Sequence, residues 1–274
     1  MLLKNRAFCF VALAFFLFAW SFPAKSQETQ KPYCMPGWSP LYSPPPVQFR
    51  DNRIISVVFK TSPEVLQALV PKPLLPNPLN LMFVYIGDLK IQTPGIGKYD
   101  YLEAGIGVPA IFSKTPGNYA VCLYLNKALP IVGGREVWGW PKKDAEITFT
   151  EKEGEIRGRV ERFGTTLLSL SAKLGNKVDP IPVQPEVPWF LLKIIPSVKK
   201  NAPPDVWQLI SSLNIDAKVK ELRGCTATLE FGTGPVDALG NIKVLEIVNA
   251  QFSVSDFAMD YGDVLHDYLA PGKK

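Results

Sequence analysis

The sequence is poor in histidine and cysteine, and this excludes several common kinds of site. His266 is the only histidine in 274 residues, so a His-based metal centre or a Ser-His-Asp triad would depend on one side chain. None of the four cysteines has the C-x-x-C spacing of metal or redox sites. Cys9 lies in an N-terminal apolar run, which leaves Cys34, Cys122 and Cys225. At most one internal disulfide can therefore form, with its pairing open, and Cys122 is expected to be a buried thiol.

A clustered excess of basic charge is also absent. The whole chain has 30 basic and 25 acidic residues. Residues 1–26 contain Lys4, Arg6 and Lys25 but no acidic residue, so their removal leaves 27 basic against 25 acidic residues. Nucleic-acid-binding proteins usually carry a concentrated basic face. The composition therefore predicts no nucleic-acid partner.

Long apolar runs are absent beyond the N-terminus. Residues 7–22 are apolar except for Ser21, and two basic residues precede them. Ala24 and Ser26 place small residues at the −3 and −1 positions of a signal-peptidase site. The run is shorter than the ~20 residues of a membrane-spanning helix. We predict a cleaved signal peptide at 1–26, an exported (periplasmic or secreted) protein and no stable membrane span after cleavage. An uncleaved N-terminal anchor is the alternative.

The remaining sequence predicts one domain behind an irregular arm. Residues 27–48 are rich in proline and serine and form a Pro-rich N-terminal arm, whereas residues 49–274 have no clear linker or repeat. This second part is long enough to bury a single core.

Short β-branched and alternating segments dominate that domain. The predicted strands cover residues 54–60, 81–86, 119–125, 144–150, 155–163, 165–174, 217–222, 226–231 and 243–254. Short helices are expected after Ser62-Pro63-Glu64, over 205–213 and over 256–269. Many strands with few helices predict an α+β, mainly antiparallel β fold, with a curved or closed β-barrel sheet and a few short flanking helices.

The most informative segment is Gly134–Lys143, which reads Gly-Arg-Glu-Val-Trp-Gly-Trp-Pro-Lys-Lys. A lysine held against an apolar wall loses hydration, so its charged form becomes costly and its pKa falls from about 10.4 towards neutrality. A neutral amine is a nucleophile for carbonyl carbon. If the segment is a strand, Trp138, Trp140 and Lys142 share one face and Lys143 faces the other way. The alternative interpretation is a solvated Lys-Lys pair at a strand end.

Two other charged residues are candidates for the same site. Glu103 lies in a segment with little other charge, where a carboxylate can be tuned to carry protons. Arg53 precedes an apolar strand and can pair with a buried acid or hold a substrate carboxylate. Taken singly, each would be interpreted as a surface residue.

Taken together, these segments resemble the acetoacetate decarboxylase family. The matching segments occur in the family's order: Asn52-Arg53, Leu69-Val-Pro-Lys-Pro-Leu74, Tyr101-x-Glu103-x-Gly-x-x-x-Pro109, 119–125, Gly134-Arg-Glu-x-x-x-x-Pro-Lys-Lys143, 192–196, 234–235, 244–248 and 264–269. The Gly-Arg-Glu…Pro-Lys-Lys segment is the most specific of them. The resemblance implies a cone-like sheet and a homo-oligomer.

The resemblance also implies a mechanism and its residues. The family's imine-forming lysine corresponds to Lys142, whose imine with a small keto acid acts as an electron sink for loss of carbon dioxide. A depressed pKa of that lysine is a known property of the family. Lys143 corresponds to the second lysine, Glu103 to the proton-handling glutamate and Arg53 to an arginine that positions Glu103 or the substrate carboxylate. No metal or organic cofactor is needed, because the lysine supplies the electron sink.

Two departures from the family's pattern concern the substrate pocket. Val84 follows Phe83 where decarboxylases carry a second carboxylate, and Trp140 replaces a tyrosine before Pro141. With Trp138, these residues predict a more apolar or differently shaped pocket, which argues against acetoacetate itself as the substrate.

Three hypotheses follow for the function. The first is a Schiff-base decarboxylase that converts a β-keto acid into a ketone and carbon dioxide. The second keeps the imine but catalyses aldol condensation or dehydration of a larger keto acid. The third is a non-catalytic, exported binder of small apolar carbonyl ligands.

Overall fold

The computed structural model describes residues 33–179 and 187–270. The predicted signal peptide and the start of the predicted arm lie outside these ranges. The strands are β1 (Val47–Lys60), β2 (Leu75–Pro76), β3 (Leu81–Thr93), β4 (Gly97–Phe112), β5 (Thr115–Leu125), β6 (Lys142–Asp144), β7 (Glu146–Lys152), β8 (Glu155–Arg162), β9 (Thr165–Lys177), β10 (Trp189–Ile195), β11 (Val206–Ser212), β12 (Asn214–Phe231), β13 (Glu246–Met259) and β14 (Asp263–Asp267). The helical elements are α1 (Pro63–Leu69), α2 (Ala128–Gly133), the π-helical turn η1 (Gly134–Trp138) and the 3-10 turn η2 (Leu239–Asn241).

The described strands form one 14-stranded sheet in the order β14-β11-β10-β5-β4-β3-β1-β13-β12-β9-β8-β7, with β2 beside β4 and β6 beside β5. Strand pairing is antiparallel except where β5 pairs with β6 and β10. The prediction of a mainly antiparallel sheet is therefore confirmed. The sheet ends at β14 and β7 and does not close, so the closed-barrel form of that prediction is wrong.

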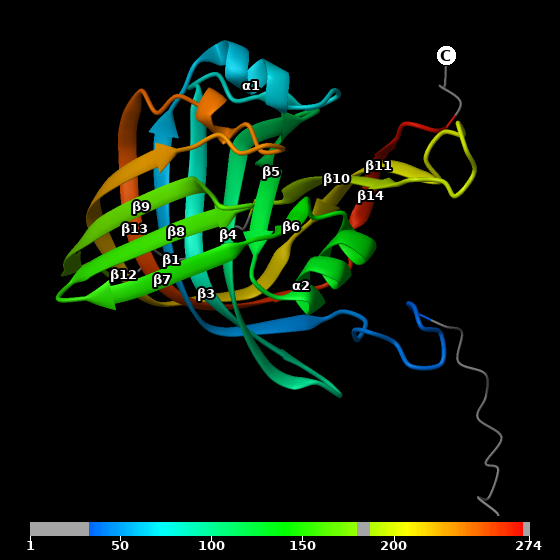
Figure 1. The fold of residues 1–274 in the computed structure, drawn as a ribbon, viewed down its shortest axis with the longest axis horizontal. Coiled ribbons are helices and arrows are strands. Elements are labelled where there is room, and N and C mark those ends of the chain that lie inside the picture. The colour runs from blue at the N-terminus through cyan, green and yellow to red at the C-terminus, as the bar shows by residue number, and fades with distance from the viewer. Residues whose placement is uncertain (1–32, 180–186, 271–274) are drawn as a thin grey trace, which may run out of the picture.

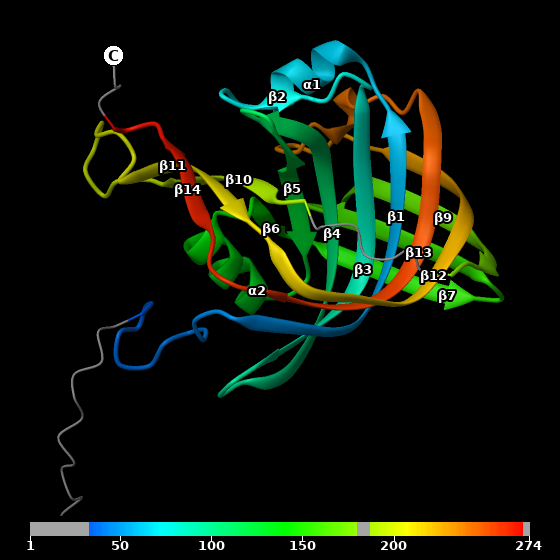
Figure 2. The ribbon, with the colours of Figure 1, turned by 180° about the vertical axis from the view of Figure 1, so that it is seen from behind.

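The sheet curls so that one part of it packs across another. Figure 1 shows β7, β8 and β9 crossing in front of β1, β3 and β4. Contacts from β7 to β3, β4 and β5 hold this arrangement, and the first hydrophobic core fills the space between the layers. Figure 2, from behind, shows α1 lying across one end of the sheet. Among the described residues, no helix has both the length and the apolar character needed to cross a membrane.

Alternation along β3 separates two cores on opposite faces of the sheet. Met82, Val84 and Ile86 point into the first core. Leu89 and Ile91 have the opposite parity and belong to a second core that also contains Trp138 and Trp140. Successive side chains of a strand point to opposite faces, so the two cores are a direct result of the sequence pattern.

Two of the predicted helices are strands. Residues 205–213 contain β11, which pairs with β10 on one side and β14 on the other. Residues 256–269 contain the end of β13 and all of β14. Backbone pairing with neighbouring strands overrides the weak helical pattern of such short segments. The helix after Ser62 is confirmed as α1, with its proline in the first turn.

The segment predicted as a two-tryptophan strand is mostly helical. α2 runs directly into η1, which contains Trp138 and ends at Gly139. Gly139 has φ 84° and donates its N–H to the carbonyls of Gly134 and Arg135. The left-handed conformation, which glycine adopts without strain, turns the chain into β6. Strand parity therefore does not explain how Trp138 and Lys142 come together.

Candidate active site

Lys142 begins β6 and points into the protein. β6 pairs in parallel with β5, which places Lys142 opposite Leu123. Only 9% of Lys142 is exposed. Its side chain lies against Gly134, where a Cβ atom would stand 2.8 Å from the Cδ atom of Lys142. The glycine at the start of η1 thus leaves the space through which the lysine stem passes.

The Lys142 amine meets a buried carboxylate. Its Nζ atom is 3.1 Å from Oε2 of Glu103, and Glu103 is 4% exposed. β4 carries Glu103 and pairs with β3 and β5, so the carboxylate is fixed by strands on both sides. The Tyr85 hydroxyl donates a 2.6 Å hydrogen bond to the other carboxylate oxygen, Oε1. The sequence prediction that Lys142 and Glu103 share a site is supported by this geometry.

Two tyrosines surround the carboxylate in protonated form. Burial, followed by the negative charge of Glu103, raises the pKa of Tyr85 well above its ordinary value, and the same causes raise the pKa of Tyr101. Both hydroxyls therefore remain hydrogen-bond donors at any physiological pH. Sequence reasoning missed Tyr85, because no motif or charge marks this residue.

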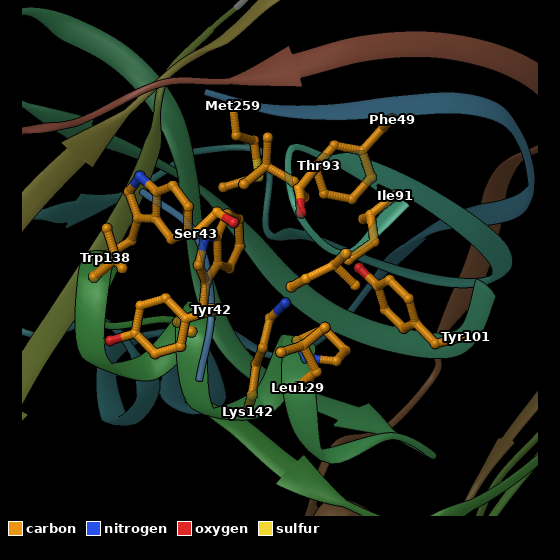
Figure 3. A pocket seen from close by; sticks show the side chains of 17 residues that line it. Tyr42, Ser43, Phe49, Ile91, Thr93, Tyr101, Leu129, Trp138, Lys142 and Met259 are labelled. Carbon is orange, nitrogen blue, oxygen red and sulfur yellow. The ribbon is translucent and has the colours of Figure 1, made fainter. Parts of the chain in front are cut away.

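Lys142 stands where two lobes of a cavity meet. The larger lobe has a volume of about 210 Å³ and the smaller about 60 Å³. Both are lined by Phe49, Tyr101, Trp140, Lys142 and Met259. Figure 3 shows the Lys142 side chain directed among the residues of the smaller lobe. The structure places both predicted tryptophans at the cavity, since Trp138 lines the smaller lobe and Trp140 lines both.

Lys143 points away from Lys142 into a separate charged cluster. Its Nζ atom is 2.6 Å from Oδ1 of Asp237, and Arg162 is 2.9 Å from Oδ2 of the same carboxylate. The Tyr124 hydroxyl also donates to Asp237 at 2.9 Å. Burial acts to raise the pKa of Asp237, but the hydrogen bonds from Lys143, Arg162 and Tyr124 outweigh it and hold that pKa below its ordinary value.

The cluster around Asp237 fixes the orientation of β6. Because neighbouring side chains on a strand face opposite ways, anchoring Lys143 on one face directs Lys142 to the other. Sequence reasoning missed Asp237, which is more than 90 residues from Lys143 along the chain.

Two residues predicted for the site lie elsewhere. Arg53 is ion-paired with Glu151 and packs beside the rings of Phe149 and Phe252. Val84 is fully buried in the first core, on the face of β3 opposite to Tyr85. Neither residue lines the cavity. The prediction that Arg53 contacts the substrate or Glu103 is therefore wrong. The prediction that Val84 lines the pocket is also wrong.

None of the three cysteines in the described residues lines the cavity. Cys34, Cys122 and Cys225 are free thiols, and Cys122 is buried as predicted. In residues 33–179 and 187–270, no three His, Cys, Asp or Glu side chains come together in a way that would hold a metal ion.

These features define an open antiparallel sheet with a lysine–carboxylate pair in a largely apolar small-molecule pocket. Residues 30–269 match the family described as acetoacetate decarboxylase (ADC). Acetoacetate decarboxylase from Burkholderia vietnamiensis is 33% identical over 252 residues, covering 89% of this chain and 98% of the relative. The enzyme of the same name from Burkholderia cenocepacia (strain HI2424) is 32% identical with the same coverage. The chain belongs to the acetoacetate decarboxylase family.

Solved structures agree with this assignment. The acetoacetate decarboxylase of Legionella pneumophila has a TM-score of 0.76 and 27% identity, and the match covers 91% of this chain and 100% of that one. The enduracididine biosynthesis enzyme MppR, solved in complex with pyruvate, has a TM-score of 0.74 and 20% identity, with 86% and 98% coverage. At 20% identity, the likeness to MppR shows a shared fold alone.

Proposed function

We propose that this protein is a lyase that decarboxylates a β-keto acid through an imine on Lys142. The observation that carries the proposal is the position of the Lys142 amine, 3.1 Å from the buried Glu103 carboxylate and at the junction of the two lobes. The amine is accessible to a ligand in either lobe. Membership of the acetoacetate decarboxylase family supports the same chemistry.

The reaction follows from the amine as an electron sink. The Nζ lone pair attacks the ketone carbon, and loss of water gives a protonated imine. The bond between the α-carbon and the carboxylate then breaks, its electron pair forms the enamine double bond, and carbon dioxide leaves. A proton is added to the α-carbon, water hydrolyses the imine, and the ketone and free amine are released. Glu103 is placed to carry the protons of these steps.

The pocket favours loss of the carboxylate over its retention. Among the described residues that line the two lobes, Lys142 is the only lysine or arginine. Once Lys142 is bound to the ketone carbon, no second cation stands ready to pair with a substrate carboxylate. A buried carboxylate that has no cationic partner and shares its lobe with the Glu103 carboxylate is costly, and its departure as carbon dioxide removes that cost.

A second candidate keeps the imine but forms a carbon–carbon bond. The larger lobe, at about 210 Å³, has room for more than the four-carbon skeleton of acetoacetate. The similarly folded MppR binds pyruvate and the condensation product of pyruvate with an aldehyde. An aldol or dehydration reaction on a larger keto acid is therefore the alternative.

Borohydride trapping tests the imine directly. Reduction in the presence of a ketone should attach the ligand irreversibly at Lys142, as located by peptide mass spectrometry. Lys142→Ala, which leaves Lys143 in place, should abolish the adduct, whereas Lys143→Ala, which removes a lysine outside the cavity, should retain it. An adduct at another lysine, or none, would contradict the proposal. Carbon dioxide release from β-keto acids, compared with product formation from pyruvate and an aldehyde, separates the two candidates.

A further inference from the structure

The N-terminal arm forms part of the wall of the smaller lobe. Tyr42 and Ser43 precede β1 and line this lobe together with Trp138. The Tyr42 hydroxyl donates a 2.5 Å hydrogen bond to Oε2 of Glu136, and the Ser43 hydroxyl donates a 2.7 Å bond to the Pro94 carbonyl. The arm is thus fastened on two sides, to η1 and to the turn between β3 and β4. Figure 3 shows Tyr42, Ser43 and Trp138 gathered on one side of Lys142.

Tyr42 stands as an end wall of this lobe. A Cβ atom on Gly133 would lie 3.3 Å from the Tyr42 ring, so the ring packs closely over the end of α2. Burial and the Glu136 hydrogen bond raise the pKa of Tyr42, which keeps the hydroxyl protonated as a donor. The ring is therefore held in one position by its packing and its hydrogen bond.

The two lobes differ in chemistry. The larger lobe contains the Glu103 carboxylate and the neutral hydrogen-bonding groups of Ser56, Tyr85 and Asn214. The smaller lobe is lined mainly by apolar side chains, among them Val47, Ile91, Leu129, Val137 and Trp138. A ketone carbon bound at the junction has one substituent for each lobe. The carboxylate of a keto acid finds hydrogen-bonding groups but no further cation in the larger lobe, and a saturated chain suits the smaller one.

We propose that the smaller lobe binds the apolar alkyl chain on the ketone carbon of the keto acid, and that Tyr42 determines the length of chain that this lobe accepts. The inference rests on the proposed imine, because that bond places the ketone carbon at the junction. A volume of about 60 Å³ corresponds to roughly four water-sized atoms, at about 15 Å³ each. The substrates are then 3-oxo acids with a short alkyl chain beyond the ketone, longer than the methyl group of acetoacetate.

Methyl ketones of increasing length test the lobe, since they are the products of 3-oxo acid decarboxylation. Quenching of tryptophan fluorescence reports their affinity, because Trp138 and Trp140 line the cavity. In the unmodified protein the affinity should rise about fourfold per methylene from propanone to 2-hexanone, and it should fall at 2-octanone. In Tyr42→Ala the rise should continue, with a gain of at least about tenfold for 2-octanone relative to the unmodified protein.

Two further variants separate the size of the ring from other effects. Tyr42→Phe keeps the ring but removes its hydrogen bond to Glu136, so the cut-off in chain length should stay where it is. Trp38→Ala removes an aromatic side chain of the same arm that is 90% exposed and outside the cavity. The dependence of affinity on ketone length in Trp38→Ala should match that of the unmodified protein.

Borohydride trapping with the same ketones distinguishes the two proposals. Adducts at Lys142 with an unchanged cut-off in Tyr42→Ala would overturn the role of the smaller lobe and leave the proposed function standing. A cut-off that shifts as far in Tyr42→Phe as in Tyr42→Ala would overturn the role of the ring. If no ketone gives an adduct, the proposed function is overturned, and with it the assignment of the smaller lobe to an alkyl chain.

Discussion

The Lys142 amine lies beside a buried carboxylate and two aromatic rings. Its Nζ atom is 3.1 Å from Oε2 of Glu103 and 5.9 Å from the ring centroids of Tyr101 and Trp140. Only a neutral amine attacks a carbonyl carbon, so a proton must leave Lys142 before the imine can form. Catalysis by this pair would therefore require Glu103 to exchange protons and not merely to neutralise the lysine.

The role of Glu103 can be tested with an isosteric amide. Glu103→Gln keeps the size of the side chain and an oxygen for the Tyr85 hydroxyl, but removes the proton carrier. We expect kcat for carbon dioxide release to fall about 10²- to 10³-fold, in the range of lost general acid–base catalysis, while borohydride still traps a ketone at Lys142. Glu151→Gln, which changes the partner of Arg53 outside the cavity, is the matched control. An unaltered kcat in Glu103→Gln would show that Glu103 carries no protons.

At the scale of elements, the junction of α2, η1 and β6 positions Lys142 in the cavity. Two glycines at this junction contribute in different ways. Gly134 leaves room for the Lys142 side chain, whereas Gly139 has φ 84° and a Cβ atom on it would lie 2.6 Å from the backbone Cα of Lys193. A side chain at the first position would displace flexible atoms, and one at the second would strain the backbone.

The two glycines therefore predict different defects. Gly134→Ala should lower the yield of trapped adduct at least about tenfold, because its methyl group displaces the amine, with a change in Tm of less than about 2 °C. Gly139→Ala should lower the free energy of unfolding by about 1–3 kcal/mol and trap normally in the fraction that remains folded. Calorimetry measures the stability of each variant, and mass spectrometry of the same samples measures the yield of trapped adduct. Equal trapping in Gly134→Ala and the unmodified protein would mean that the stem of Lys142 can take another path.

At the scale of the whole molecule, Asp237 ties together distant parts of the sheet. Its carboxylate joins Lys143 of β6, Arg162 of β8 and Tyr124 of β5. Its lowered pKa means that the native state holds the charged form more favourably than the unfolded chain does. That contribution is fully present above the unfolded pKa of about 4 and is lost as the pH falls through the folded value.

Urea unfolding as a function of pH tests this contribution. At pH 7, Asp237→Asn should be less stable by roughly 2 kcal/mol, because Lys143 and Arg162 lose their charged partner while Lys143 is partly exposed. The difference between the variant and the unmodified protein should shrink as the pH falls below about 4. A difference that stays constant down to the acid transition would show that Asp237 is not the titrating group.

Export and homo-oligomer formation also belong to this scale, and both stay predictions from the sequence. The predicted signal peptide at residues 1–26 lies outside the described residues. N-terminal sequencing of protein from fractionated cells would test cleavage and export. Light scattering of the purified protein would give the number of subunits.

The sequence by itself predicted the mainly antiparallel sheet and helix α1, and it made Lys142 and Glu103 candidates for one site. Alternating β-branched residues specify strands locally, and the Gly-Arg-Glu…Pro-Lys-Lys segment is specific enough to mark the lysine. Only the tertiary structure decided that β11 and β14 are strands, because β11 is held by backbone pairing between β10 and β14, and β14 pairs with β11. It likewise placed Tyr42, Tyr85 and Asp237 and removed Arg53 and Val84 from the cavity. Which face of a strand becomes a pocket depends on how the sheet curls, and that is settled by contacts between distant elements.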